Sequence, residues 1–160
     1  MSLEAMQMAK EVDETDMAIL RALVKNARAS YREVASEIGV AVGTVQHRMQ
    51  KMEGRGILNG FRPIIDYNKL GFEIDAIIAL ETPREKSLEL AKTLQKHKNV
   101  KSIYHTTGDT DVFIRVQFKS AQELYDFLMK ELTDQYVKRS KTYIVLDKHN
   151  NYGTLLLKEA

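Results

Sequence analysis

The sequence predicts an α+β protein, with an N-terminal winged helix-turn-helix followed by a ferredoxin-like βαββαβ domain. Three observations lead to this prediction. Apolar residues recur at helical spacing in three short segments up to residue 54, and Gly39 separates the second segment from the third. Asn59-Gly60 then lies between two short apolar runs, a pattern typical of a β-hairpin. From residue 74 onward, strand-like and helix-like segments follow in the order β-α-β-β-α-β.

The composition is that of a globular protein and identifies no partner by itself. Of the 160 residues, 44% are hydrophobic and 29% are charged, and the formal net charge is only +2. No apolar run reaches the roughly 18 residues of a membrane helix, and the first residues lack the basic and apolar regions of a signal peptide. The chain contains no cysteine, which excludes disulfides and thiolate metal sites. We therefore expect a cytoplasmic protein that contacts no membrane.

The first helix is expected to begin in the acidic stretch from Asp13 to Asp16, because acids suit the positive end of a helix dipole. Residues 1–12 carry no core pattern and are interpreted as an N-terminal arm, while residues 13–66 are expected to form the first domain. The apolar stripe of this helix is predicted to consist of Met17, Leu20, Leu23, Val24 and Ala27.

Two further helices and a hairpin complete the predicted first domain. Ser30 and Glu33 form a capping-box pattern at the start of the second helix. Its inward residues are predicted to be Val34, Ala35 and Ile38. A glycine follows and permits a sharp turn into the third helix, which is expected to span about Val42 to Gly54 with Val45, Met49 and Met52 inward. The hairpin is predicted to pair residues 56–58 with residues 61–65.

The second domain is assigned to residues 67–160. Its strands are predicted at Ile74–Leu80, Val100–Thr106, Val112–Phe118 and Val137–Leu146, with one more at Gly153–Leu157. One helix is expected to lie between the first two of these strands, carrying Leu88, Leu90, Ala91 and Leu94 up to about His97. The other begins at Ser120 and has Leu124, Phe127, Leu128 and Leu132 inward.

The outer face of the third helix is polar and suits a nucleic acid. Its side chains can hydrogen-bond base edges or phosphates in a major groove. Between Gly39 and Arg62 the chain has four basic residues and a single acid, Glu53. The candidate DNA contacts are Arg32, Thr44, Gln46, His47, Arg48, Gln50 and Lys51. The alternative interpretation is a charged helix face that is merely solvated.

Four segments, in this order, resemble the Lrp/AsnC family of transcription regulators. DETDMAILRALVKNARASYREVASEIGV is similar to the opening of that family, and TVQHRMQKMEGRGIL is similar to its recognition helix. PIIDYNKLGF resembles the strand and Leu-Gly corner between its domains, and TTGDTDVFIRV resembles its Gly-Asp-x-Asp turn. The resemblance implies a winged helix-turn-helix for double-stranded DNA and a ferredoxin-like domain for dimerisation and effector binding. It also implies that dimers assemble into octamers or larger discs, with an amino acid bound between dimers.

Three positions depart from the family pattern. Ala41 replaces the serine common before the recognition helix, and an alanine side chain can neither cap a helix nor donate to a phosphate. Gly43 removes another frequent polar side chain. Thr110 stands where many relatives carry an aromatic residue, which leaves the identity of the effector open.

The Gly-Asp-x-Asp turn is the effector site that the resemblance implies. Backbone amides near Gly108 would hold the carboxylate of an amino acid, and Asp109 or Asp111 would pair with its ammonium group. The full set of candidates is Tyr104, Thr106, Thr107, Gly108, Asp109, Thr110 and Asp111. The alternative is a plain hairpin in which Gly and Asp serve the turn geometry.

Catalytic and metal-binding alternatives have less support in the sequence. The four histidines show no paired metal-ligand spacing, and no phosphate loop or nucleophile motif is present, so we expect neither a metal, a cofactor nor an enzyme. Sirohaem and haem-precursor decarboxylases resemble the same two-domain layout, and His105 and Arg115 are the groups that such a site would use. A third alternative is a ligand-sensing or assembly module that has lost DNA binding.

Overall fold

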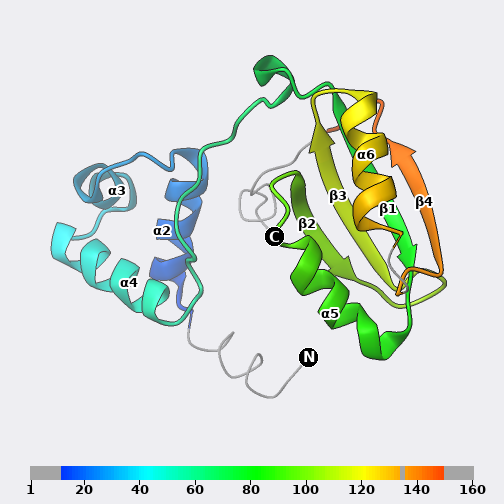
Figure 1. Ribbon diagram of the computed structural model, residues 1–160. Coiled ribbons are helices and arrows are strands. Elements are labelled where there is room, and N and C mark those ends of the chain that lie inside the picture. Colours follow the sequence, from blue (N-terminus) through cyan, green and yellow to red (C-terminus); the bar gives the residue numbers. More distant parts are fainter. Residues whose placement is uncertain (1–11, 134–135, 150–160) are drawn as a thin grey trace. The chain divides into compact units, whose positions relative to one another are not determined.

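The computed structural model describes residues 12–133 and 136–149, which fall into two compact units. Of the described residues, the first unit contains 12–63 and 149, and the second contains 64–133 and 136–148. Figure 1 shows their secondary structure, and each unit is described by itself below. None of the described helices is long and apolar enough to cross a membrane.

The first unit consists of three helices: α2 (Glu14–Lys25), α3 (Tyr31–Ile38) and α4 (Val42–Gly54). The starts of α2 and α3 both carry capping boxes. At α2, the Asp13 carboxylate accepts from the backbone N–H of Asp16 (3.0 Å), and the Asp16 carboxylate accepts from that of Asp13 (3.2 Å). Ser30 and Glu33 exchange the same bonds at α3. Gly39 ends α3 with a φ of 74°, a backbone conformation that glycine adopts at little cost.

The core of this unit confirms the predicted inward faces of α3 and α4 and corrects that of α2. Its buried side chains are Ile19, Ala22, Leu23, Val34, Ala35, Val45, Met49 and Met52. Ala27 lies beyond the end of α2 and is exposed. Asp16 is buried beside Ile19, because its carboxylate is held by the capping box, so the stripe lies about one residue from the predicted one.

The predicted hairpin is wrong, and the described residues therefore form a helix-turn-helix without a wing. No strand is present between residues 55 and 66. The backbone N–H groups of Ile57 (2.9 Å) and Leu58 (3.3 Å) both donate to the carbonyl oxygen of Met52, and both side chains pack on the helical core. Because these groups close the end of α4, they are not available to pair with residues 61–65, and Pro63 has no N–H to donate.

The second unit has the predicted ferredoxin-like order of elements. The short 3-10 helix η1 (Asn68–Leu70) precedes β1 (Ile74–Glu81), α5 (Arg84–Leu94), β2 (Val100–His105), β3 (Val112–Phe118), α6 (Ala121–Glu131) and β4 (Arg139–Ile144). The four strands form one antiparallel sheet in the order β2-β3-β1-β4. The strand predicted at residues 153–157 and the arm up to residue 11 lie outside the described residues.

Both helices of this unit cover the same face of the sheet (Figure 1). Alternate residues of β1 and β3 point into the resulting core, which Leu90, Leu94 and Phe127 complete. Leu88 was predicted to face inward, but it is 65% exposed, and Ser87 is buried in its place. The opposite face, hereafter the open sheet face, carries exposed apolar side chains: Ile77 on β1, Tyr104 on β2 and Tyr143 on β4.

Candidate nucleic-acid interface and ligand site

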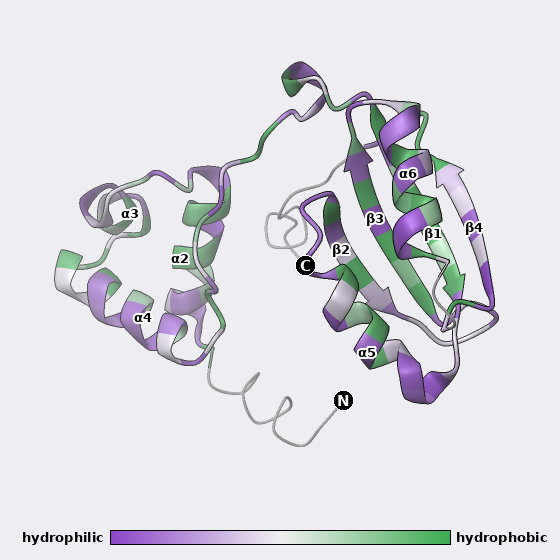
Figure 2. Cartoon of the chain, in the orientation of Figure 1, coloured by the Kyte–Doolittle hydropathy of each residue, from purple (hydrophilic) through white to green (hydrophobic). Residues whose placement is uncertain are grey.

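The surface of α4 separates buried apolar residues from exposed polar ones. Val45, Met49 and Met52 are buried, while Gln46, His47 and Gln50 are exposed. Thr44 and Lys51 are half-buried, and Arg32 is exposed in the first turn of α3. Hydrophilic residues accordingly cover much of the visible side of α4 (Figure 2). Six of the seven candidate DNA contacts thus have side chains that reach solvent from adjacent helices.

The start of α4 is open. Ala41 occupies the N-cap position and makes no side-chain hydrogen bond to the helix. A Cβ added at Gly43 would meet no atom within 4 Å, so packing within the described residues does not require glycine there. The backbone N–H of Thr44 already donates to the carbonyl oxygen of Ala41 (3.0 Å). The N–H groups of Val42 and Gly43 are the first two of the helix and need no partner within it, so this turn presents donors to a ligand.

Arg48, the seventh candidate, is bound on the inner side by the start of α2. Its guanidinium donates to the carboxylate of Asp13 and lies 3.4 Å from each carboxylate oxygen of Asp16. Asp16 is only 2% exposed. The backbone N–H of Asp16, and then the Arg48 guanidinium, hold the pKa of Asp13 below its ordinary value, and Asp13 in turn raises the pKa of Arg48. This contact joins α4 to α2 and gives Arg48 partners within the unit.

The turn between β2 and β3 is held by bonds that use some of the predicted effector residues. The backbone N–H of Thr106 donates to the carbonyl of Asp111 (3.0 Å), and the Thr106 hydroxyl donates to the carbonyl of Thr110 (2.6 Å). The Asp111 carboxylate accepts from the backbone N–H of Thr82 (2.9 Å) and so ties the turn to the end of β1. Gly108 has a φ of 114°, which explains the glycine. Asp109 is exposed and forms no ion pair within the described residues.

A pocket of about 250 Å³ lies between this turn and the start of α5. Four residues of the β2–β3 region line it: His105, Thr106, Thr107 and Asp111. The other two, Arg84 and Ser87, come from the first turn of α5, and sequence reasoning missed both. No local pattern marks them, because only the sheet brings residues 84–87 beside residues 105–111.

Tyr104 lies on the other face of the sheet from this pocket. It lines an apolar hollow of about 400 Å³ with Ile77, Phe113 and Arg115, and Thr106 touches both spaces. The predicted effector residues are therefore divided between two faces. Arg115 is fixed there by a bidentate pair with Asp75, at 3.0 and 2.6 Å. Burial by itself raises the pKa of Asp75, but hydrogen bonds from Arg115 and Gln117 outweigh it and hold that pKa below its ordinary value.

The same geometry argues against the tetrapyrrole interpretation. His105 is on the helix-covered side with Arg84, while Arg115 is on the open sheet face and already holds Asp75. The sheet therefore separates the two groups that a shared cavity would need.

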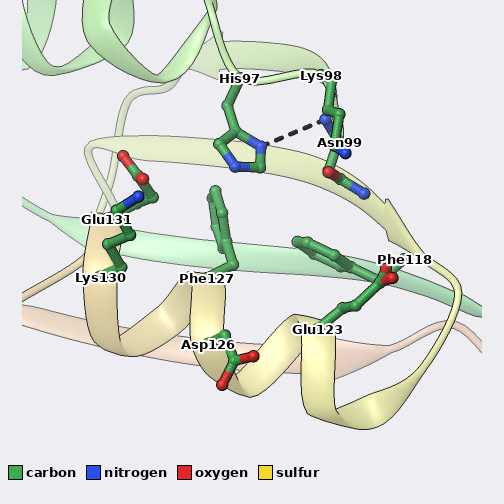
Figure 3. A pocket seen from close by; sticks show the side chains of 9 residues that line it. All are labelled: His97, Lys98, Asn99, Phe118, Glu123, Asp126, Phe127, Lys130 and Glu131. Carbon is green, nitrogen blue, oxygen red and sulfur yellow. Dashed lines mark hydrogen bonds between the residues drawn. The ribbon is translucent and has the colours of Figure 1, made fainter.

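A further pocket of about 250 Å³ lies between α6 and the turn after α5 (Figure 3). His97 stands over the ring of Phe127, with centroids 4.8 Å apart, and its Nδ1 accepts from the backbone N–H of Asn99 (3.3 Å). Two lysines and three acids also line this pocket: Lys98, Lys130, Glu123, Asp126 and Glu131. Within the described part of the chain, no group of three His, Cys, Asp or Glu side chains is placed to hold a metal ion.

Comparisons with known proteins agree in both parts of the chain. Residues 12–53 match the AsnC-type helix-turn-helix domain, and residues 75–155 match the Lrp/AsnC ligand-binding domain. An uncharacterised HTH-type transcriptional regulator of Pyrococcus furiosus is 34% identical over 137 residues, which cover 86% of this chain and 93% of the relative. The regulatory protein AsnC of Haemophilus influenzae is 35% identical over 76% of this chain and 81% of its own length. The structure of Escherichia coli AsnC superimposes with a TM-score of 0.79 at 29% identity, covering 86% of this chain and 93% of that one.

Proposed function

This chain belongs to the Lrp/AsnC family of transcriptional regulators, and we propose that it binds specific double-stranded DNA sequences through α4 under the control of an amino acid bound in its second domain. One observation carries the proposal: α4 exposes Gln46, His47 and Gln50 to solvent, while its other side buries three apolar residues in the core. Residues 13–66 are assigned to DNA and residues 67–160 to assembly and ligand, and the protein acts in the cytoplasm.

The exposed side chains divide into two roles. Gln46, His47, Gln50 and Thr44 read base edges in the major groove, since amide, imidazole and hydroxyl groups can both donate and accept. Lys51 and Arg32 bind phosphates. Arg48, predicted as a DNA contact, is a positioning residue that holds α4 against α2. The open start of α4 leaves room for a close approach of the DNA backbone at Gly43.

A dimer formed through the open sheet face would supply the two recognition helices that a pseudo-palindromic site needs. That face exposes 38% of Ile77, 57% of Tyr104 and 53% of Tyr143 around an apolar hollow. Burying this surface against a second copy removes apolar area from water. Two recognition helices in a symmetric dimer, about one helical turn (roughly 34 Å) apart, read a pseudo-palindrome.

The effector is proposed to be an amino acid at the β2–β3 turn. Because Asp111 already binds the backbone of residue 82, Asp109 is the carboxylate that is free to pair with an ammonium group. Backbone amides near Gly108 and the Arg84 guanidinium are available for the carboxylate of the ligand. Such pairing is strong where water is excluded, and association of dimers, up to an octamer, would supply that exclusion.

Retention of sheared genomic DNA on the immobilised protein tests the DNA assignment. We expect a few pseudo-palindromic sites in the fractions that elute at high salt, with steep loss of binding as salt rises. The control is the same column carrying the variant Gln46→Ala/Gln50→Ala, which should lose site enrichment but keep bulk retention. If the parent protein retains no more DNA than a neutral protein at low salt, the DNA assignment is wrong.

Exchanging single side chains on α4 should separate reading from anchoring. Lys51→Ala should weaken binding to all sequences alike and reduce the salt slope by about 1, because it removes one phosphate contact. His47→Ala should alter the ranking of sites, because it lowers the discrimination between bases at the base pair it reads by about 1–3 kcal/mol. Competition binding with a library of operator variants measures both effects. Equal losses across all sites for both variants would contradict the division of roles.

Asp109→Asn should abolish the response to the effector while leaving DNA binding intact. The twenty amino acids are first screened for an increase in the unfolding temperature of the parent. For the amino acid that gives one, we expect roughly tenfold or greater loss of affinity in the variant, because a charged hydrogen bond is lost. Asp126→Asn, an exposed acid of α6, is the matched control. Unchanged affinity in Asp109→Asn would remove Asp109 from the site.

A further inference from the structure

Three lysines of the second unit lie near Phe72, at the end of the sheet where β1 begins and β3 ends. The Lys101 ammonium lies 4.4 Å from the ring centre of Tyr67 and 5.6 Å from that of Phe72. The Lys119 ammonium lies 5.8 Å from the Phe72 centre. Lys98 and Lys119 also line, with Phe72, a small pocket of about 140 Å³. We name Lys98, Lys101 and Lys119 the lysine cluster.

The cluster has almost no compensating negative charge. In the part of the chain that the structure describes, none of the three lysines forms an ion pair with a carboxylate. Glu123 is the one acid lining the 140 Å³ pocket, and its carboxylate accepts from the backbone N–H of Lys119 at 3.0 Å. Three cations thus share a small region of surface, and their mutual repulsion is relieved when an anion binds.

The aromatic rings explain how the lysines are held without carboxylates. An ammonium group within about 6 Å of a ring centre is attracted by the negative face of the ring. The rings of Phe72 and Tyr67 therefore orient Lys101 and Lys119 and do not compete with an incoming anion as a carboxylate would. Because the lysines cover these faces, the rings offer no platform for stacking an unpaired base, which favours a phosphate backbone over single-stranded bases.

The position of the cluster in the chain indicates which phosphates are in reach. About a dozen residues separate the end of α4 from Tyr67, and an extended chain of that length spans at most about 40 Å. DNA held by α4 is therefore presented to the cluster at a high local concentration, whereas a free anion is not.

We infer that Lys98, Lys101 and Lys119 form a second phosphate-binding surface, which contacts the backbone of the DNA outside the segment read by α4. The surface extends toward the pocket of Figure 3, since Lys98, Asn99 and Glu123 line both spaces. It contributes affinity and salt dependence but no sequence preference. The inference rests on the proposed binding of double-stranded DNA.

The test measures how the affinity of the full-length protein for duplex DNA depends on salt. Each lost phosphate contact lowers the slope of log K against log salt by about 0.9, so Lys98→Gln/Lys101→Gln/Lys119→Gln should lower it by roughly 3 per protomer. The loss should be equal for operator and random DNA. The matched control Lys86→Gln/Lys92→Gln/Lys138→Gln removes three lysines that line neither of these two pockets and should leave the slope unchanged.

Two further variants separate charge from folding. Lys98→Arg/Lys101→Arg/Lys119→Arg keeps the charge and should keep the parent slope. The single variant Lys98→Gln removes a lysine that forms no cation–π contact within the described residues. It should therefore fold as the parent does, and its slope should be lower by about 0.9 per protomer. If the Gln triple variant has the same slope as the parent, the inference is overturned. If the triple variant does not fold, the same result for Lys98→Gln overturns it.

Titration with sodium pyrophosphate distinguishes a free anion from DNA. Pyrophosphate binding that depends on the lysine cluster, together with an unchanged DNA slope in the Gln variants, would assign the cluster to a small anion and overturn its role in DNA binding. If the parent itself binds no DNA, the proposed function fails instead, and the two failures are therefore distinguishable.

Discussion

Ile77→Lys is expected to convert the proposed dimer into monomers and to lower operator affinity by more than about 100-fold. Ile77 lies on β1, opposite Arg115 of β3 and Tyr143 of β4, and is 38% exposed on the open sheet face. In a symmetric dimer formed through this face, two new ammonium groups would meet each other and the two copies of Arg115. Like charges brought together at an interface cost several kcal/mol, and about 3 kcal/mol is already more than 100-fold in the dimer constant.

Sedimentation velocity and operator binding, measured on the same samples, check this expectation. Leu88→Lys is the matched control, because Leu88 is 65% exposed on α5 and lies on the helix-covered side of the sheet. The control should sediment and bind as the parent does. A variant Ile77→Lys that sediments as the parent would show that the open sheet face is not the dimer interface, and the spacing argument for a pseudo-palindrome would fall with it.

Arg48→Ala is expected to loosen α4 and to weaken operator binding by roughly tenfold or more, although Arg48 need not touch DNA. The guanidinium bridges Asp13 and buried Asp16 at the start of α2, and Ala41 provides no side-chain cap at the start of α4. Without the guanidinium, the carboxylates of Asp13 and of buried Asp16 lie close together with no cation to compensate their charge. We also expect the unfolding temperature to fall by several °C.

The pH dependence of stability identifies this ion pair. Because the folded-state pKa of Asp13 lies below its ordinary value of about 3.9, its contribution is fully present above that value and is lost as the pH falls through the lower, folded pKa. Arg48→Ala should make this acid loss shallower. Thermal unfolding between neutral and acid pH, with exposed Arg28→Ala as the control, measures it. Full operator affinity in Arg48→Ala would contradict the positioning role.

The sequence predicted those elements that depend on short-range patterns. The capping pair of Ser30 and Glu33, the glycine turn at residue 39 and the spacing of Val45, Met49 and Met52 all act within a few residues, so their outcome can be read locally. The strand Val112–Phe118 was predicted with the observed bounds for the same reason. The order of elements in the second unit followed from the alternation of these patterns.

Only the tertiary structure decided the features that join distant segments. The Asn-Gly pair is a strong hairpin signal, yet no hairpin forms, because Ile57 and Leu58 close the end of α4 and pack on its core. Arg48 reads as a DNA contact on a helical face, but its partners stand 32 and 35 residues earlier in the chain. Arg84, at the start of α5, lines the same pocket as residues of the β2–β3 turn, which stand much later in the chain. The sequence by itself thus determined most of the elements and their order, because propensity, capping and periodicity are local, whereas packing alone determined the distant partners of charged side chains such as Arg48.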